Sequence, residues 1–296
     1  MAENTAAPSR LFCFGLGYTA LKLLDGLRGE GWRIAGTCRG EDKLRRLRAE
    51  GIDAHRFDSD RPLDDPAKAL AGATHVLASV PPDERGDPVL RQHGHDLAAL
   101  RGLVWVGYLS TTGVYGDRGG AWVDEAAAPR PTTDRGRRRL AAEEGWLALW
   151  RSRGLPVHLF RLAGIYGPGR NQLVALRHGE AKRIDKPGQV FSRIHVADAV
   201  AVLRASMARP DPGAAYNLAD DEPAPPQDVV AYAAGLLGMA PPPLISFADA
   251  ELSPMARSFY AESKRISNRR IKDELGVRLR FPNYRAGLAA LLEPAS

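Results

Sequence analysis

Short apolar segments alternate with helical patterns along the first half of the chain, and this alternation constrains its fold more than any other feature. The apolar segments lie at residues 11–15, 32–38, 54–57, 74–80, 103–110 and 156–162. Apolar residues at helical spacing separate several of them, at residues 20–27, 41–50, 90–100 and 137–151. Because the short segments are apolar throughout, they predict parallel strands covered on both faces. With right-handed connections, the chain is expected to form an α/β fold with a doubly wound parallel sheet.

Prolines and glycines break up the pattern beyond about residue 165. Clear interruptions are Gly167-Pro168-Gly169, the run Glu222–Pro226 and Pro241-Pro242-Pro243. We therefore predict a sheet domain at residues 1–166, to which residues 189–219 return. Residues 167–188 and 220–296 are predicted to form a smaller C-terminal lobe.

The composition excludes several classes of protein. The chain has 296 residues, of which 44% are hydrophobic and 26% charged, enough for a sizeable core. No apolar stretch approaches the ~18 residues of a membrane-spanning helix, so no membrane association is expected. Cys13 and Cys38 lie in apolar runs without a Cys/His cluster, which predicts no metal site and a reducing, cytoplasmic location. The first ten residues lack an apolar segment and are expected to form a short mobile tail.

The chain is basic, with 41 Lys and Arg against 35 Asp and Glu and a formal net charge of +6. This balance favours anionic ligands. The arginines are scattered apart from one cluster between Arg135 and Arg139, so charge alone supports a nucleic-acid-associated protein only as the weakest alternative. We expect no nucleic-acid partner.

The first connection between a strand and a helix carries the pattern G-x-G-x-x-A. In this pattern Gly15 permits a tight turn, Gly17 lets the backbone approach a pyrophosphate, and the small Ala20 lets helix and strand pack closely. The helix N-terminus, at Tyr18 and Thr19, supplies unpaired N–H groups and a positive dipole end. The sequence therefore predicts a dinucleotide-binding loop in a Rossmann-like fold. The alternative is an ordinary tight turn between strand and helix.

The end of the second strand bears on the choice of dinucleotide. A site that prefers NAD carries an acidic residue there, whereas this chain has Arg39, whose guanidinium suits a 2′-phosphate. NADP is therefore favoured over NAD, the alternative for Arg39 being a solvated loop arginine. Glu41 and Asp42 fit better as acids in the first turn of the next helix. At the end of the third strand, Asp58 is expected either to accept from the adenine amino group or to cap Ser59–Pro62.

Further motifs follow in order along nearly the whole chain. They are GLGYTA from Gly15, LSTTGVYGD from Leu109, VDEAAAPRP from Val123, RLAGIYGPGRN from Arg161, RIHVADAV from Arg193, YNLADDEPA from Tyr216 and KRISNRRIKDELG from Lys264. Together they resemble the extended short-chain dehydrogenase/reductase family, also called NAD-dependent epimerase/dehydratases. The resemblance implies an NAD(P)-binding oxidoreductase or epimerase-like protein. Its C-terminal lobe would bind a small polar or nucleotide-linked substrate.

The resemblance also implies an acid/base site, which this chain alters. The family's substrate-orienting Ser/Thr position matches Thr111, with Thr112 as the alternative. The family's Tyr and Lys positions fall on Arg135 and Arg139. Since a guanidinium does not shuttle protons at neutral pH, Arg135 cannot replace a phenol, although Arg139 could still bind the nicotinamide ribose. The chain therefore resembles an atypical branch of the family that lacks the Tyr/Lys pair.

Other residues are weaker candidates for the missing acid. Tyr115 is a candidate substitute, although Tyr115 and Tyr166 more often pack near the pocket in such a pattern. His195, between apolar neighbours, is expected to be a structural hydrogen-bonding residue. Asp124 and Glu125 precede a proline-rich loop and are expected to order it, with a catalytic carboxylate as the alternative.

Two groups of residues are expected to contact ligands. Ser79 and Pro81 end the fourth strand, where the family's loop passes the nicotinamide side of the cofactor. Arg170, Asn171 and Arg193 follow the sixth strand and are expected to face an anionic substrate, the alternative being solvated surface charges.

Two functions therefore remain open. The first is an NAD(P)-dependent oxidoreductase or epimerase acting on a small-molecule substrate, with Thr111 orienting the reacting oxygen and the proton donor unassigned. The alternative is a non-catalytic dinucleotide-binding protein, structural or redox-sensing, which Arg135 and Arg139 favour. The helix at residues 137–151 corresponds to one that often joins dimers in the family, so the resemblance also implies a homodimer.

Overall fold

The structure is a computed structural model that describes residues 9–292, so the predicted N-terminal tail lies almost entirely outside the described residues. Its main sheet contains the strands β1 (Arg10–Phe14), β2 (Arg33–Cys38), β3 (Asp53–Arg56), β4 (His75–Ala78), β5 (Trp105–Thr111), β7 (Val157–Leu162) and β11 (Ala215–Leu218). The first six of these correspond to the apolar segments that predicted strands. Each begins and ends within two residues of the prediction.

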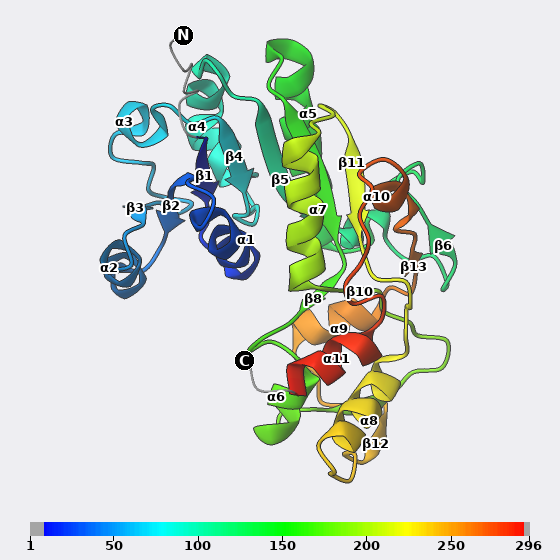
Figure 1. The fold of residues 1–296 in the computed structure, drawn as a ribbon. Helices are drawn as coiled ribbons and strands as arrows, with labels where there is room; N and C mark the ends of the chain where they lie inside the picture. Colours follow the sequence, from blue (N-terminus) through cyan, green and yellow to red (C-terminus); the bar gives the residue numbers. More distant parts are fainter. Residues whose placement is uncertain (1–8, 293–296) are drawn as a thin grey trace. The chain divides into compact units, whose positions relative to one another are not determined.

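The strands of the main sheet lie in the order β11-β7-β5-β4-β1-β2-β3 (Figure 1). The pairings of β1 with β2 and β4, of β2 with β3 and of β4 with β5 are parallel. The order reverses between β1 and β4, as in a dinucleotide-binding sheet. The predicted doubly wound α/β fold is therefore confirmed.

The helices of this region are α1 (Tyr18–Arg28), α2 (Glu41–Ala49), α3 (Pro66–Leu70), α4 (Pro88–Ala99), α5 (Asp134–Arg153) and α7 (Val196–Ala208). The chain moves in one direction from β1 to β3 and in the other from β4 to β7. Right-handed connections therefore place α1 and α2 on one face and α4 and α5 on the other. On the α4 and α5 face, Phe12 and Phe14 of β1 share a buried core with Val89, Tyr108 and Trp146.

The chain divides into two compact units. Unit 1 comprises the residues up to Ser110, Arg138–Phe160 and Leu203–Ala215. Unit 2 comprises Thr111–Arg137, Arg161–Val202 and the residues from Tyr216 onward. These bounds differ from the predicted domains, because residues 111–137 and 161–166 group with the C-terminal segments.

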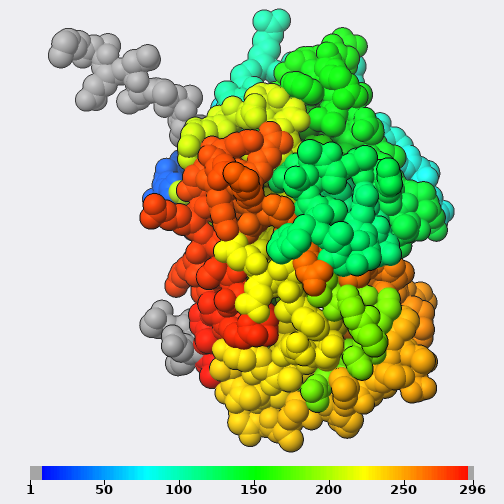
Figure 2. All heavy atoms as spheres, turned by 90° about the vertical axis from the view of Figure 1, so that its right-hand side faces the viewer, coloured from blue at the N-terminus to red at the C-terminus, as the bar shows by residue number. Residues whose placement is uncertain are grey.

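Unit 2 is built from short elements. They are the 3₁₀ helix η1 (Thr112–Tyr115), β6 (Trp122–Val123), β8 (Gly164–Tyr166), α6 (Gln172–Arg177), β9 (Arg183–Asp185), β10 (Arg193–His195), α8 (Pro226–Leu236), β12 (Leu244–Ser246), α9 (Pro254–Tyr260), β13 (Arg265–Ile266), α10 (Arg269–Asp273) and α11 (Tyr284–Leu292). Three parallel pairs join β8 to β10, β9 to β12 and β6 to β13. The last pair brings distant parts of the sequence together, and the teal surface around β6 lies beside the orange surface around β13 in Figure 2.

A separate apolar core holds α6, α8 and α11 of unit 2 together. Leu173 of α6, Val230 and Ala233 of α8, and Leu288 of α11 are buried in it. None of the helices within residues 9–292 combines the length and apolarity needed to cross a membrane.

Candidate functional site

The glycine loop of unit 1 is locked by hydrogen bonds from two neighbouring strands. The Gly15 N–H donates to Oγ1 of Thr37 on β2 at 2.8 Å, and the Ser79 hydroxyl after β4 donates to the Gly15 carbonyl oxygen at 2.6 Å. Gly15 has a φ of +91°, and a Cβ at this position would lie 2.7 Å from the Ser79 Oγ atom. Only glycine therefore fits this tight turn without strain.

Gly17 differs from Gly15, because nothing in the protein requires it to be glycine. It is the N-cap of α1 with a φ of −84°, and a Cβ built on it meets nothing within 4 Å. As a glycine, Gly17 brings no side chain to cap the helix, and the first turn contains no acidic residue. A helix N-terminus of this kind suits an anionic acceptor such as a pyrophosphate. The loop geometry fits the predicted dinucleotide.

Two residues beside the loop were missed by the sequence analysis. Thr37 accepts the Gly15 hydrogen bond, and Nζ of Lys43 on α2 donates to the Leu16 carbonyl oxygen at 2.5 Å. Lys43 adds a positive charge next to the loop. The polar Thr37 stands out near the end of a largely apolar strand, and this could have indicated a contact with the loop. No motif in the sequence indicates the contact of Lys43.

Arg39 follows β2 directly, and its side chain is exposed. Glu41 and Asp42 lie in the first turn of α2 as predicted, and Asp42 pairs with Arg45 at 2.5 Å. Glu41 lies 3.5 Å from Arg56, so both carboxylates of that turn engage arginines of unit 1. The arrangement fits the predicted 2′-phosphate contact of Arg39.

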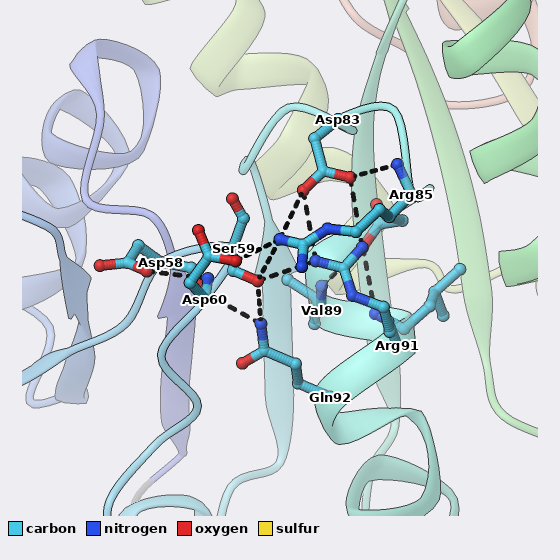
Figure 3. A network of polar contacts seen from close by, with 10 residues as sticks. Asp58, Ser59, Asp60, Asp83, Arg85, Val89, Arg91 and Gln92 are labelled. Atoms are coloured by element: carbon cyan, nitrogen blue, oxygen red, sulfur yellow. Dashed lines mark hydrogen bonds and ion pairs between the residues drawn. The ribbon is translucent and has the colours of Figure 1, made fainter.

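Asp58 caps a turn, which is the second of its two predicted roles. Its Oδ1 atom accepts the Asp60 N–H at 2.9 Å, and its own N–H donates to the Arg61 carbonyl oxygen at 3.1 Å (Figure 3). The capping carboxylate holds the loop after β3 in a fixed shape.

A polar network joins this loop to the loop after β4 (Figure 3). Arg91 of α4 donates to the Ser59 carbonyl oxygen at 2.8 Å and to the Asp83 carboxylate at 3.2 Å. Gln92 and Arg85 donate to the same carbonyl oxygen at 2.8 Å and 3.2 Å. The segment that begins with the exposed Pro81 is thereby held at the carboxyl ends of the strands, where ligands of such sheets bind.

Arg139, at the family's Lys position, is bonded to β5 within unit 1. Its NH1 atom donates to the Leu109 carbonyl oxygen at 2.6 Å and to the Tyr108 hydroxyl at 3.2 Å. Its guanidinium carbon lies 5.7 Å from the centroid of the Tyr108 ring. Burial raises the pKa of Tyr108, so that phenol stays neutral. Arg139 is therefore a fixed cation.

The remaining candidates for catalysis lie in unit 2. Thr111 is partly exposed, and its Oγ1 atom accepts the Gly113 N–H at 3.2 Å at the start of η1. Arg135, at the family's Tyr position, is exposed, and its guanidinium carbon lies 5.1 Å from the centroid of the Phe259 ring. Thr111 thus combines a structural hydrogen bond with access to solvent.

Tyr115 does not suit the predicted role of substitute acid. It is 0% exposed, its hydroxyl donates to Asn217 Oδ1 at 2.8 Å, and it accepts from Arg161 NH1 at 2.9 Å. Burial also raises its pKa. Because the phenol is enclosed and fully bonded, we leave it out of the catalytic set.

Asp124 orders the start of the following loop as the sequence predicts, whereas Glu125 bonds the backbone of β11 instead. Asp124 Oδ1 accepts the Ala126 N–H at 3.0 Å, and Glu125 Oε1 accepts the Asn217 N–H at 2.6 Å. Each carboxylate therefore accepts a hydrogen bond from a backbone N–H group and holds that backbone in place.

The three predicted substrate residues converge on one pocket of unit 2. Arg170, Asn171 and Arg193 all line a cavity of about 290 Å³. The parallel pairing of β8 with β10 sets Arg193 opposite Gly164. The other lining residues are Ile165, Tyr166, Gln172, Val229, Tyr284 and Leu288. The pocket combines two arginines with apolar and aromatic walls, a lining that suits an anionic ligand with a ring.

The polar groups of this pocket are held by the backbone. Asn171 caps α6, since its Oδ1 accepts the Val174 N–H at 3.0 Å and its Nδ2 donates to the Gly167 carbonyl oxygen at 2.8 Å. Arg193 NH1 donates to the Phe191 carbonyl oxygen at 2.8 Å. Burial lowers the pKa of Arg193, but an arginine remains protonated at neutral pH.

His195 has a structural environment. Its Nδ1 atom accepts the Ala197 N–H at 3.2 Å, and its ring lies 4.1 Å from the centroid of the Phe281 ring. Burial lowers its pKa to about 4, so it is neutral at physiological pH. Elsewhere in residues 9–292, no group of three or more His, Cys, Asp and Glu is placed to hold a metal ion.

The chain is similar to several known proteins across nearly its full length, although no family model matches it. It is 29% identical over 279 residues to Protein YeeZ of Escherichia coli (strain K12), covering 91% of this chain and 95% of YeeZ. A conserved protein of unknown function from Silicibacter pomeroyi DSS is 55% identical, with a TM-score of 0.87 and coverage of 96% of this chain and 98% of that chain.

A more distant solved structure is the UDP-glucuronic acid 4-epimerase of Bacillus cereus in complex with UDP-glucuronic acid and NAD. It is 16% identical with a TM-score of 0.76, and the match covers 96% of this chain and 98% of that chain. At this identity the likeness shows the fold. The chain therefore has the same Rossmann-like α/β fold as this epimerase.

Proposed function

We propose that this protein binds a nicotinamide dinucleotide through its glycine loop and acts as an oxidoreductase or epimerase-like enzyme. The observation that carries the proposal is the contrast between Gly15, which the turn itself requires, and Gly17, which faces open space at the N-terminus of α1. A glycine that the protein does not need for its own packing is explained by the close approach of a pyrophosphate.

NADP is the favoured dinucleotide in this proposal. Arg39 is the exposed residue at the end of β2, where an NAD-specific site would carry a carboxylate. A guanidinium there would form charge-assisted hydrogen bonds with a 2′-phosphate.

The substrate is proposed to be a small anionic or nucleotide-linked molecule bound in the pocket of unit 2. Arg170 and Arg193 supply positive charge, and Tyr166 and Tyr284 supply aromatic walls. The Bacillus cereus epimerase, which shares the fold, was solved with UDP-glucuronic acid, a ligand of this chemical class.

The chain's own residues would position the reactants. A bound nicotinamide supplies a hydride donor or acceptor. The Thr111 hydroxyl is placed on the strand that carries the family's orienting Ser or Thr and would hold the reacting oxygen. Arg135 and Arg139 would act as fixed cations that stabilise negative charge, since neither releases a proton at neutral pH.

A second candidate function is a non-catalytic dinucleotide-binding protein. The observation that favours it is the engagement of Arg139 with Leu109 and Tyr108, which gives the residue at the family's Lys position structural hydrogen bonds. Such a protein would use the dinucleotide as a structural or redox-sensing ligand.

An assay for catalytic turnover distinguishes the enzyme from the non-catalytic binding protein. The purified protein is incubated with NADPH or NADP and a panel of ketones, alcohols and sugar nucleotides, and absorbance at the reduced nicotinamide band is followed together with product formation. Turnover that the Thr111→Val variant lowers, with dinucleotide affinity unchanged, supports the enzyme. Tight dinucleotide binding without turnover on the whole panel supports the second candidate.

Two further expectations belong to this proposal. A cytoplasmic location is inferred from Cys13 and Cys38, which are both buried free thiols. A homodimer is inferred from the family resemblance of α5, and sedimentation of the purified protein would test it.

A further inference from the structure

Asp220 is a buried carboxylate next to the anion-binding pocket of unit 2. It follows β11 and is 1% exposed, and its N–H donates to the Arg193 carbonyl oxygen at 2.6 Å. Its Oδ1 atom accepts the Glu222 N–H at 3.3 Å, whereas Oδ2 has no hydrogen-bond partner within residues 9–292. A buried, half-satisfied carboxylate is costly, so its presence calls for an explanation.

Charged groups face Asp220 from its own loop and from the neighbouring strand. The guanidinium of Arg193 on β10 favours the ionised carboxylate, whereas the charges of Asp221 and Glu222 oppose it. Asp221 pairs with Lys272 at 2.5 Å, and Glu222 pairs with Arg285. Both neighbouring acids are therefore compensated by other cations, and Arg193 is the cation that acts on Asp220.

Two more titratable groups lie close by. Tyr166 on β8 shares the pocket with Arg193, and burial raises its pKa further from neutrality. Asp198 on α7 accepts the N–H groups of Arg280 and Phe281 at 2.7 Å and 3.0 Å. Burial raises the pKa of Asp220 to about 8 and also raises the pKa of Asp198.

We propose that Asp220 is a positioning residue that sets how much positive charge Arg193 offers to an anion in the pocket. With its proton, Asp220 is neutral and Arg193 is free to attract the ligand. Without the proton, the buried carboxylate competes with the ligand for the same guanidinium. The inference rests on the proposed function, because it assumes that the pocket binds an anion.

The proposal implies that ligand and proton bind together. An anion at Arg193 weakens the attraction that favours ionised Asp220, so binding should draw protons from solvent onto this carboxylate, up to one per site where Asp220 is fully ionised. Affinity should therefore fall as the pH rises through the pKa of Asp220. With a pKa of about 8, the loss between pH 7 and pH 9 would be up to about tenfold.

The test is calorimetry of uridine diphosphate binding between pH 7 and pH 9, where the phosphates of the probe are already ionised. Titrations in two buffers of different ionisation enthalpy give the number of protons taken up. The Gly17→Val protein serves as the background, so that the probe cannot occupy the glycine loop. Asp220→Asn removes the titrating group, and Asp249→Asn, an exposed acid of unit 2, is the matched control.

The Gly17→Val protein with Asp220 intact and its D249N derivative should lose affinity toward pH 9. Their proton uptake on binding should rise from about half a proton at pH 8 toward one proton at pH 9. D220N should bind with an affinity that barely changes with pH and with no proton uptake. If D220N does not fold, proton uptake by the Gly17→Val protein still tests whether a group with a pKa near 8 gains a proton when the anion binds. Binding without proton uptake, or an equal pH profile in D220N, overturns the role of Asp220 and leaves the proposed function intact. Absence of binding at every pH overturns the anion pocket and this inference together.

Discussion

Arg139 of α5 donates a 2.6 Å hydrogen bond to the carbonyl oxygen of Leu109 on β5. The same guanidinium donates to the Tyr108 hydroxyl. Arg139 therefore ties α5 to β5 within unit 1.

Replacing Arg139 with Met should destabilise the protein. The variant removes the hydrogen bonds that Arg139 donates to the Leu109 carbonyl oxygen and to the Tyr108 hydroxyl. The expected loss in unfolding free energy is about 1–3 kcal/mol. Denaturant unfolding measures the change. The control is Arg138→Met, which removes a pair with the exposed Glu84 and should cost less than about 1 kcal/mol. Equal losses of unfolding free energy in both variants would show that the hydrogen bonds of Arg139 do not stabilise the protein more than an exposed ion pair does.

The Gly17→Val variant should fold normally and lose dinucleotide binding. A Cβ atom at this position meets no described protein atom within 4 Å, so the melting temperature should stay close to that of the original protein. A bound pyrophosphate would collide with it. Gly29→Val is the control, because Gly29 also has open space around it but lies at the other end of α1. Undiminished binding by Gly17→Val would refute the assignment of the loop.

The Arg39→Ala variant should reduce the preference for NADP over NAD. Loss of a guanidinium contact with the 2′-phosphate corresponds to about 1.5–3 kcal/mol, or roughly a tenfold to hundredfold weaker NADP affinity. NAD affinity should hardly change. Arg45→Ala removes a neighbouring arginine that pairs with Asp42 and provides the control. An unchanged ratio of the two dissociation constants would contradict the role of Arg39.

The protein should lose stability in mild acid because three histidines are buried in the neutral form. Burial lowers the pKa of His75, His158 and His195 to about 4 in the folded protein. The unfolded chain takes up these protons near pH 6.5, so the contribution of each group is lost as the pH falls from about 6.5 to about 4.

His158→Gln isolates one of these groups. The His158 Nε2 atom accepts the Asp211 N–H at 2.9 Å, and an amide can take this place without titrating. The slope of unfolding free energy against pH below 6.5 should be shallower in the variant than in the original protein, as measured by urea unfolding. Parallel slopes would mean that His158 does not remain neutral in the folded state.

The sequence predicted the main sheet well because its strands are buried on both faces. Phe12 and Phe14 of β1 and their apolar neighbours produce continuous runs that turn residues do not interrupt. Arg170, Asn171 and Arg193, which the sequence analysis grouped as substrate residues, line one pocket, and their role there stays a prediction.

The sequence could not predict contacts between distant segments. Tyr115 looked like a candidate acid, but its partners Asn217 and Arg161 lie 102 and 46 residues away and enclose its hydroxyl. Strands β6 and β13 have two residues each, too few to show a period of two. The bounds of the two units were missed because those bounds depend on such pairings.

The most direct test of this account is calorimetric titration of the protein with NADP and, separately, with NAD. The account expects one dinucleotide per chain, tighter binding of NADP than of NAD, and loss of both in the Gly17→Val variant. An absence of binding heat with either dinucleotide at millimolar concentration, for protein whose folding has been verified, would contradict the central claim that the glycine loop holds a pyrophosphate.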